Sequence, residues 1–198
     1  MSGCGDKVTG VVTGDDVKGI VQSDTLSELG TSLLRHLDSG ASFASIAKRL
    51  VTANAYLGAR PIVDALRQGA DIVITGRVAD PSLAVAPAVY HHGWSWNDWD
   101  RLAAATVAGH LIECGTQVTG GISTDWLDLE LAGDLGYPIV EVSEDGSLVV
   151  TRPHGTGGVV NEQTVKEQLL YEIGDPAKYL SPDVTVSFQG IKLDDEGN

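Results

Sequence analysis

The stretch that decides the fold class is Gly69–Ser82, with the sequence GADIVITGRVADPS. Its β-branched run Asp71–Thr75 lies between two glycines, which predicts a short buried strand. Asp80 and Pro81 then predict the start of a helix, with Asp80 as the N-cap and Pro81 in the first turn. A strand, a loop and a helix in this order are typical of a parallel α/β layer.

The same alternation continues on both sides of this stretch. Strands are predicted over 8–13 and 50–53, and helices over 25–37 and 62–68, from the spacing of their apolar residues. A longer helix over 98–116 carries an alanine-rich face that permits close packing, and Asn97 is expected to cap it. We therefore predict an α/β fold with a parallel-type, three-layer core over residues 1–118.

The composition changes over residues 119–198, where Gly, Thr and Asp are frequent. Asp145-Gly146 lies between two β-branched runs, 139–142 and 148–151, which is a strong signal for a β-hairpin. A helix is predicted from Asn161 to Ile173 and a last strand over 184–188. We predict a glycine-rich, irregular, hairpin-bearing portion that packs on the same domain.

The charge of the chain restricts its partners. Thirteen Lys and Arg against 27 Asp and Glu give a formal net charge of −14. An acidic surface repels phosphate backbones and anionic lipids, so we expect neither nucleic acid nor a membrane as a partner. The N-terminus has no apolar signal region, and two cysteines, Cys4 and Cys114, cannot form a disulfide framework. We expect a cytoplasmic protein.

Four parts of the chain carry motifs that are specific when they are taken together. They are Thr52–Ala59, Gly69–Ser82, Thr106–Gly115 with Gln117–Gly121, and Gly155–Gly158 with Glu167–Pro176. On these motifs the chain resembles the acyclic terpene utilisation (AtuA-type) family, over nearly its whole length and least before Leu50. Members of that family are longer at both ends. We therefore expect a fragment, a trimmed version or a minimal member, without the site residues that a missing N-terminal region contributes.

Arg77 is the first candidate for substrate binding. It follows the predicted strand and precedes a helix N-terminus, where ligands of open α/β sheets bind and where free N–H groups favour anions. We predict that Arg77 holds a carboxylate or phosphate in the deepest polar pocket there. The alternative is that Arg77 pairs with Asp71 or Asp80 and organises the loop. Asp80 is a second binding candidate, although helix capping alone would explain it.

Asn54 and Tyr56 follow a predicted strand and precede a helix, so they are expected to face the same crevice. An asparagine can orient a substrate carbonyl, and a tyrosine can act as a weak acid. From the residues alone, a turn asparagine and a half-buried tyrosine explain both. The family motif around them weighs equally for a catalytic role.

His110, Glu113 and Cys114 share one helix face, because they are three and four positions apart. Three roles are open: a metal site, a hydrogen-bonded structural pair of His110 with Glu113, and acid–base catalysis by His110. The sequence has no second ligand pair with metal spacing, so we predict no transition metal. The structural pair is favoured, and His110 as a proton carrier is the catalytic hypothesis.

Two glycine loops, Thr119-Gly120-Gly121 and Thr156-Gly157-Gly158, are the remaining binding candidates. Glycine lets backbone amides wrap around an anion, and the second loop lies shortly before a helix. Neither loop has the phosphate-loop pattern with its lysine or the dinucleotide fingerprint. A tight turn is the default interpretation, and substrate binding is the functional one.

These observations lead to one functional hypothesis and a rival. The resemblance implies an enzyme, or a catalytic-subunit fragment, of acyclic terpene and branched-chain acid catabolism. Hydratase, isomerase or lyase chemistry on a carboxylate or acyl-CoA is expected, and no cofactor is predicted because no nicotinamide or flavin motif is visible. Expected partners are the small-molecule acid or acyl-CoA, and either a homo-oligomer or another catabolic subunit. The rival is a non-catalytic binding or scaffold subunit of a catabolic acyl-CoA enzyme complex.

Overall fold

The computed structural model describes residues 11–12, 35–36, 38–49, 51, 56–127 and 133–195. The chain divides into two compact units that interleave along the sequence. The first comprises Met1–Leu57 with Asp64–Val78, and the second comprises Gly58–Val63 with Ala79–Asn198. We predicted a boundary between two parts of the chain at residue 118. These two units have other bounds, and the predicted boundary stays a prediction.

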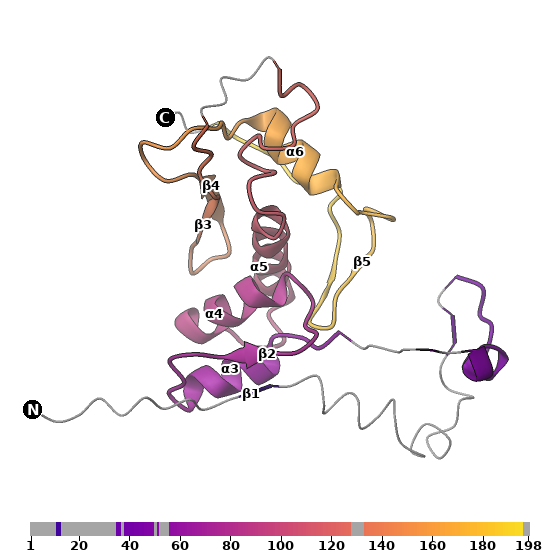
Figure 1. The fold of residues 1–198 in the computed structure, drawn as a ribbon. Coiled ribbons are helices and arrows are strands. Elements are labelled where there is room, and N and C mark those ends of the chain that lie inside the picture. Colours follow the sequence, from indigo (N-terminus) through magenta and orange to yellow (C-terminus); the bar gives the residue numbers. More distant parts are fainter. Residues whose placement is uncertain are drawn as a thin grey trace, which may run out of the picture. The chain divides into compact units, whose positions relative to one another are not determined.

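The first unit contains a parallel strand pair (Figure 1). Strand β1 (Val11–Val12) pairs with β2 (Ile74–Thr75), and an isolated parallel bridge joins Leu57 to Val78. Two short 3-10 helices, η1 (Phe43–Ser45) and η2 (Ala47–Arg49), also belong to this unit. The helix expected over 25–37 and the strand expected over 50–53 fall mostly outside the described residues.

The α/β class is confirmed, because the chain contains both helices and strands, mixed along its length. The three-layer parallel core stays a prediction, since parallel pairing within the described residues is limited to β1–β2 and isolated bridges. The expected burial of the strand over 71–75 is wrong, because Ile72 and Ile74 are 60% and 59% exposed. β-branched residues favour extended backbone, but only layers packed on both faces bury such a strand.

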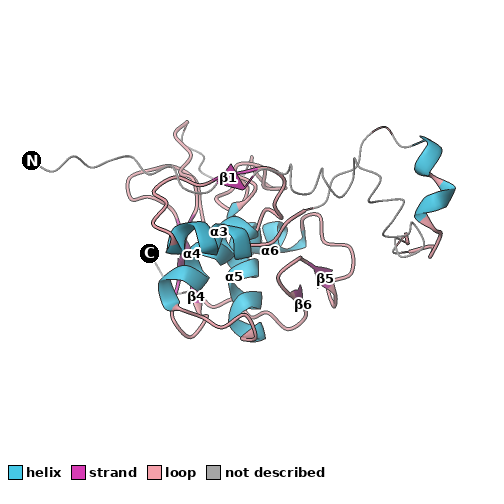
Figure 2. Cartoon of the chain, turned by 90° about the horizontal axis from the view of Figure 1, so that it is seen from below, coloured by secondary structure: helices cyan, strands magenta, loops and turns pink. Residues whose placement is uncertain are grey.

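Helices α4 (Ser82–His92) and α5 (Trp99–Ile112) form the core of the second unit and lie side by side (Figure 2). On the alanine-rich face of α5, Ala105 and Ala108 are buried and Ala103 and Ala104 are half-buried, and a Cβ on Gly109 would lie 2.6 Å from the Cα of Pro81. The predicted close packing is confirmed. The helix ends four residues before the predicted Thr116, because the chain turns at Glu113 and Gly115 adopts a left-handed φ of 60°.

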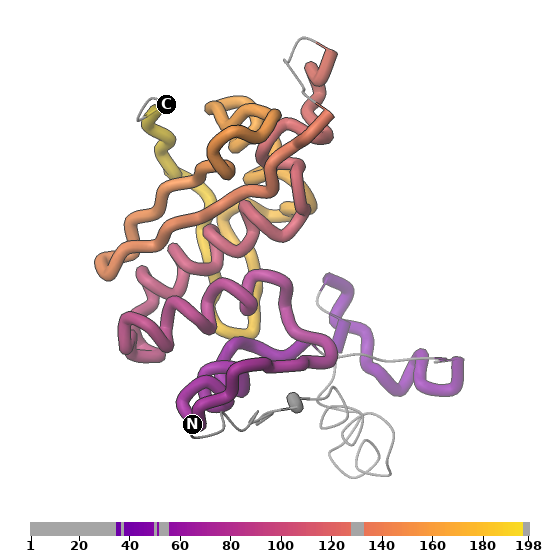
Figure 3. The backbone as a smooth tube through the Cα atoms, turned by 60° about the vertical axis from the view of Figure 1, so that its left-hand side comes forward, coloured from indigo at the N-terminus to yellow at the C-terminus, as the bar shows by residue number. Residues whose placement is uncertain are grey.

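The hairpin predicted around Asp145-Gly146 is confirmed. Strands β3 (Ile139–Val142) and β4 (Leu148–Thr151) are antiparallel, and Gly146 has a φ of 92°, which favours glycine. The Trp94 indole donates to the carbonyl of Glu144 over 3.0 Å, which ties the turn to the end of α4. Helix α5 contacts both strands of the hairpin (Figure 3).

Helix α6 (Glu162–Leu170) begins with a reciprocal cap. The Asn161 side chain accepts from the backbone N–H of Thr164, and the Thr164 side chain accepts from the backbone N–H of Asn161. This confirms Asn161 as the start of the helix, although α6 ends at Leu170 and not at the expected Ile173. The chain then forms the antiparallel pair β5 (Tyr179–Leu180) and β6 (Thr185–Val186). Both α6 and β6 contact α5.

The turn between β5 and β6 carries Asp183, whose carboxylate joins two helix starts. It accepts the backbone N–H of Ala59, just before α3 (Arg60–Arg67), at 2.9 Å from each oxygen. It also accepts the hydroxyl of Ser82, the first residue of α4, over 3.0 Å. A negative charge at helix N-termini is stabilising, so this turn holds the starts of both helices.

Candidate functional site

Among the described residues, the most deeply buried ion pair of titratable side chains lies at the C-terminal end of α5. The His110 ring is 1% exposed, and its Nδ1 lies 2.9 Å from Oε1 of Glu113. Glu113 is the C-cap of the helix, so the i, i+3 spacing puts both side chains on one face. The predicted hydrogen-bonded pair is confirmed, and we refer to it as the His110–Glu113 dyad.

Three buried polar atoms around the dyad have no hydrogen-bond partner within the described residues. They are Nε2 of His110, Oε2 of Glu113 and Oε1 of Gln168. The other amide atom of Gln168 donates to the backbone carbonyl of His110 over 2.6 Å, which satisfies a carbonyl in the last turn of the helix. An unsatisfied buried polar atom costs about 1–3 kcal/mol, and such atoms call for an explanation in chemistry or binding.

The proton arrangement of the dyad follows from its geometry. When Glu113 is ionised, Nδ1 of His110 carries the ring proton and donates it to the carboxylate. The lone pair of Nε2 is then free, and no described side chain or backbone group uses it. A histidine oriented by a carboxylate, with its second nitrogen free, is the arrangement of a general base.

Two aromatic rings lie against His110. The Phe188 ring meets it edge-on at a centroid distance of 5.4 Å, and the Tyr179 ring lies 6.0 Å away. Burial raises the pKa of the Tyr179 phenol above its usual range, and the negative charges of Glu113, Asp80 and Glu172 act in the same direction. The phenol therefore stays protonated at neutral pH and can donate a hydrogen bond.

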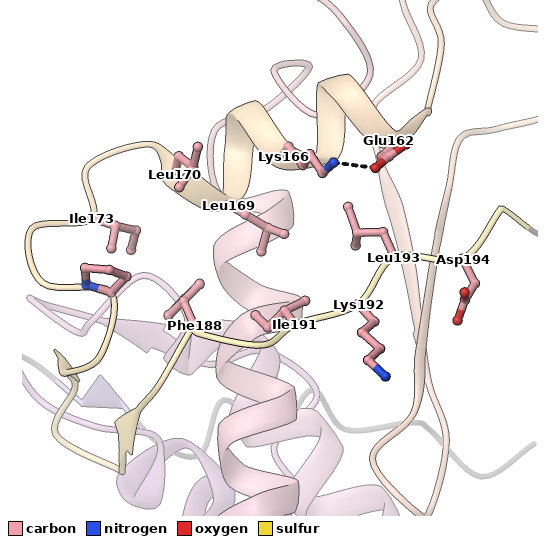
Figure 4. A pocket seen from close by; sticks show the side chains of 11 residues that line it. Glu162, Lys166, Leu169, Leu170, Ile173, Phe188, Ile191, Lys192, Leu193 and Asp194 are labelled. Atoms are coloured by element: carbon pink, nitrogen blue, oxygen red, sulfur yellow. Dashed lines mark hydrogen bonds and ion pairs between the residues drawn. The ribbon is translucent and has the colours of Figure 1, made fainter.

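A cavity of about 540 Å³ lies between α6 and the segment 188–194, and Phe188 belongs to its wall (Figure 4). We call it the α6 cavity. Seven apolar side chains form most of its lining: Leu169, Leu170, Ile173, Pro176, Phe188, Ile191 and Leu193. Because Phe188 touches both His110 and the cavity, the dyad lies one side chain behind the wall. The cavity and the dyad are both in the second unit.

The residues of the α6 cavity were not identified in the sequence. Its charged lining residues, Glu162, Lys166, Lys192 and Asp194, are ordinary surface types in sequence and form no motif. The available signal was the apolar pair Ile191 and Leu193, which interrupts an otherwise polar C-terminal stretch. Apolar residues in an otherwise polar C-terminal stretch are expected to pack against another apolar surface, and in this structure that surface belongs to α6.

Tyr56 and Arg77 come together in the first unit. The Arg77 guanidinium lies over the Tyr56 ring at 5.9 Å from its centroid, and the backbone N–H of Leu57 donates to the Arg77 carbonyl. Both side chains are exposed, and neither lines the α6 cavity. Asn54 lies outside the described residues. The roles of these three residues in binding and catalysis stay predictions.

The expectation that Asp80 caps the following helix is wrong. The N-cap of α4 is Pro81, and no side chain there accepts a hydrogen bond from the helix. The proline takes the helical conformation itself, with φ of −61° and ψ of −21°, so the cap moves one residue along the chain. Asp80 is exposed, and its role in substrate binding stays a prediction.

The two glycine loops pack against each other. The Thr119 hydroxyl donates to the Gly136 carbonyl over 2.8 Å, and the Thr119 carbonyl accepts from the N–H of Val159. The amides of Gly120, Gly121 and Gly157 all donate to backbone carbonyls of the same chain. The Thr156 hydroxyl donates to the Pro153 carbonyl over 2.7 Å, and a Cβ on Gly158 would meet the Thr119 carbonyl at 2.6 Å. These contacts support the tight-turn interpretation, and anion binding by the loops stays a prediction.

In the part of the chain that the structure describes, no helix has the length and apolar character needed to cross a bilayer. No group of three His, Cys, Asp or Glu side chains gathers there in a way that could hold a metal ion.

Sequence comparison identifies a family. The sequence model described as acyclic terpene utilisation family protein AtuA matches residues 2–198. Comparison with curated proteins and with solved structures finds no significant match.

Proposed function

Because the chain belongs to the acyclic terpene utilisation family AtuA, we propose that it is an enzyme, or the catalytic part of one, in the breakdown of branched-chain acids. Its substrate would be a carboxylate or an acyl-CoA, and its chemistry that of a hydratase, isomerase or lyase. Reactions of these classes commonly use a base that removes a proton near a carbonyl group, and the conjugate acid of that base then delivers the proton.

The observation that carries this proposal is the free Nε2 of the buried His110. The other ring nitrogen, Nδ1, lies 2.9 Å from Oε1 of Glu113, and this hydrogen bond sets the orientation of the ring. Nε2 then has no hydrogen-bond partner within the described residues. Because the His110 side chain is only 1% exposed, its basic nitrogen is protected from bulk water, unlike that of an exposed histidine. Protection from water strengthens the electrostatic interactions that such a proton transfer uses.

The residues of the dyad would share the proton transfer. Nε2 of His110 would take a proton from the substrate, and the carboxylate of Glu113 would stabilise the imidazolium that forms. The proton would then return to another atom of the substrate, or to a departing hydroxyl group. The Tyr179 phenol, protonated at neutral pH, would donate a hydrogen bond to the substrate carbonyl. Access to Nε2 would require the Phe188 ring to rotate, because this ring lies edge-on against His110.

Turnover by matched variants tests the proposal. The protein is incubated with saturated, unsaturated and 3-hydroxy branched acyl-CoAs and their free acids, and products are identified by mass spectrometry. We expect turnover of at least one compound. His110→Asn should lower it by about 10²–10⁴-fold, the usual contribution of a general base. Glu113→Gln should lower it less and should shift the pH profile of kcat/KM, because the imidazolium loses its charged partner.

The control is His154→Asn, which changes an exposed histidine outside the dyad. It should leave turnover unchanged, and circular dichroism should show that all three variants are folded. A protein that turns over no compound of the panel, or a His110→Asn variant with unchanged turnover, would contradict the proposal. Arg77→Ala belongs in the same series, because Arg77 is still a candidate for holding the acidic group.

A further inference from the structure

We infer that the α6 cavity is a binding site for an amphiphilic carboxylate, that is, a molecule with an apolar chain and a carboxylate head. The cavity volume of about 540 Å³ lies in the range of roughly 300–1,000 Å³ that is usual for small-molecule sites. This inference goes beyond the proposed function, because the charged end that would hold the carboxylate lies at the opposite end of the cavity from Phe188, and so away from the dyad behind Phe188 (Figure 4).

The cavity has one apolar end and one charged end (Figure 4). Helix α6 and the segment 188–194 run in opposite directions along it, so the apolar residues Leu170 and Ile173 lie at the same end as Phe188. The first turns of α6 lie at the other end, near Lys192 and Asp194. A ligand that fills this space must itself be apolar at one end and polar at the other.

Leu170 is available to a ligand. Its side chain is 71% exposed although it lines the cavity, whereas its neighbour Leu169 is buried in the core. An exposed leucine beside a concave apolar surface gains from being covered by an apolar chain. The apolar end of the cavity therefore favours a hydrocarbon chain over water.

The charged end favours an anionic head. Lys166 is paired with Glu162 one helical turn away, and both side chains are more than half exposed. Exposed pairs of this kind are weak, so a ligand carboxylate can attract Lys166 away from Glu162. Lys192 has no ion pair within the described residues, and its long side chain can follow a ligand more freely than the short side chain of Asp194.

The composition of the whole chain makes these lysines informative. The protein has about two acidic residues for each basic one, whereas the charged lining of the cavity has one lysine for each carboxylate: Lys166 and Lys192 with Glu162 and Asp194. A net charge of −14 repels anions at long range. Selective binding of an anion would therefore show that the residues of the cavity attract it, because the net charge of the whole protein repels it.

Calorimetric titration of the full chain with four probes tests the inference. The probes are decanoate, decanol, decyltrimethylammonium and acetate, each below its micelle concentration. We expect saturable one-to-one binding of decanoate, weaker binding of decanol and of the ammonium compound, and no binding of acetate. Tighter binding of decyltrimethylammonium than of decanoate would overturn the inference, because the cavity would then recognise cations through Glu162 and Asp194.

Two variants locate the bound probe. Leu170→Ser should weaken decanoate binding about tenfold or more, the contribution of a covered leucine side chain. Its control is Leu180→Ser, which changes another leucine that is 51% exposed but lies outside the cavity. Lys192→Gln should weaken binding about two- to fivefold, as expected for an exposed charge contact, whereas Lys178→Gln should not. Unchanged decanoate binding in Leu170→Ser would place the probe elsewhere and overturn the inference.

The same titration separates this inference from the proposed function. His110→Asn should bind decanoate as the unaltered chain does, because its ring is behind the cavity wall and not part of it. If turnover fails while decanoate still binds in a Leu170-dependent way, the proposed function falls and the binding site stands. If turnover depends on His110 but none of the probes binds, the binding site falls.

Discussion

At the scale of single residues, the carboxylate of Asp183 connects the starts of two helices. It accepts hydrogen bonds from the N–H of Ala59 and the hydroxyl of Ser82, at the starts of α3 and α4. The neighbouring Gly58 makes room for it, because a Cβ there would lie 2.3 Å from Oδ1 of Asp183. Nothing in the local sequence marks Asp183, since its partner Ala59 is 124 positions away.

Asp183→Ala should lower the free energy of unfolding by about 1–3 kcal/mol, because the N–H of Ala59 loses its acceptor in a partly buried place. Urea unfolding followed by circular dichroism measures the change. Asp71→Ala, at an exposed position in a loop, is the matched control and should stay within about 0.5 kcal/mol. Equal effects of the two substitutions would show that Asp183 does not join the helix starts.

At the scale of elements, the starts of α5 and α6 separate a wrong prediction from a confirmed one. Helix α6 begins where it was predicted to begin, and the structure shows that Asn161 caps it in a reciprocal pair with Thr164. Asn97 was expected to cap α5, but the N-cap is Asp98, and no side-chain cap bond is present there. The two asparagines look alike in sequence, and the difference arises because the Ser95 hydroxyl accepts the backbone N–H of Asn97 and holds it in a separate turn.

Asn161→Ala should therefore destabilise the protein by about 1 kcal/mol, the usual cost of removing an N-cap side chain. Asn97→Ala should change the free energy of unfolding by less than half of that. Both values come from urea unfolding under the same conditions. A larger effect at Asn97 than at Asn161 would contradict this assignment of the caps.

At the scale of the whole molecule, the acidic composition links stability to pH. Hydrogen bonds from the backbone and hydroxyl of Ser147 lower the pKa of Asp145 below its usual value of 3.8. Burial alone would raise the pKa of Glu167, but hydrogen bonds from Thr124, Gln163 and Ser123 outweigh it, and the pKa falls below 4.5. Both carboxyl groups bind protons less readily in the folded chain than in the unfolded one.

Groups with a lowered folded pKa stabilise the protein above the unfolded pKa, and this contribution is lost as the pH falls through the folded value. We expect the free energy of unfolding to change little between pH 7 and about pH 5 on their account, and to fall below about pH 4. Urea unfolding across this range tests the expectation. The double variant Asp145→Asn with Glu167→Gln should show a smaller fall, and an unchanged fall would contradict the assignment.

The sequence by itself determined the features that depend on residues a few positions apart. The hairpin at Asp145-Gly146, the start of a helix at Asn161, the close packing of α5 and the His110–Glu113 pair were all predicted and confirmed, because turn and helix geometry are local. The family was also identified from sequence motifs.

Only the tertiary structure decided burial and the assembly of the candidate site. The strand over 71–75 was expected to be buried because it is β-branched, but burial depends on what packs over it, and Ile74 is exposed. His110 was a candidate by spacing, but its surroundings come from distant residues: Gln168, 58 positions away, donates to its backbone carbonyl, and the Phe188 ring lies against its ring. The α6 cavity likewise joins a helix to a segment near the C-terminus. Such contacts between residues far apart in the chain leave no periodic pattern in the sequence. The sequence around each residue reflects its own helix or strand, and the contact forms only when the distant elements pack together.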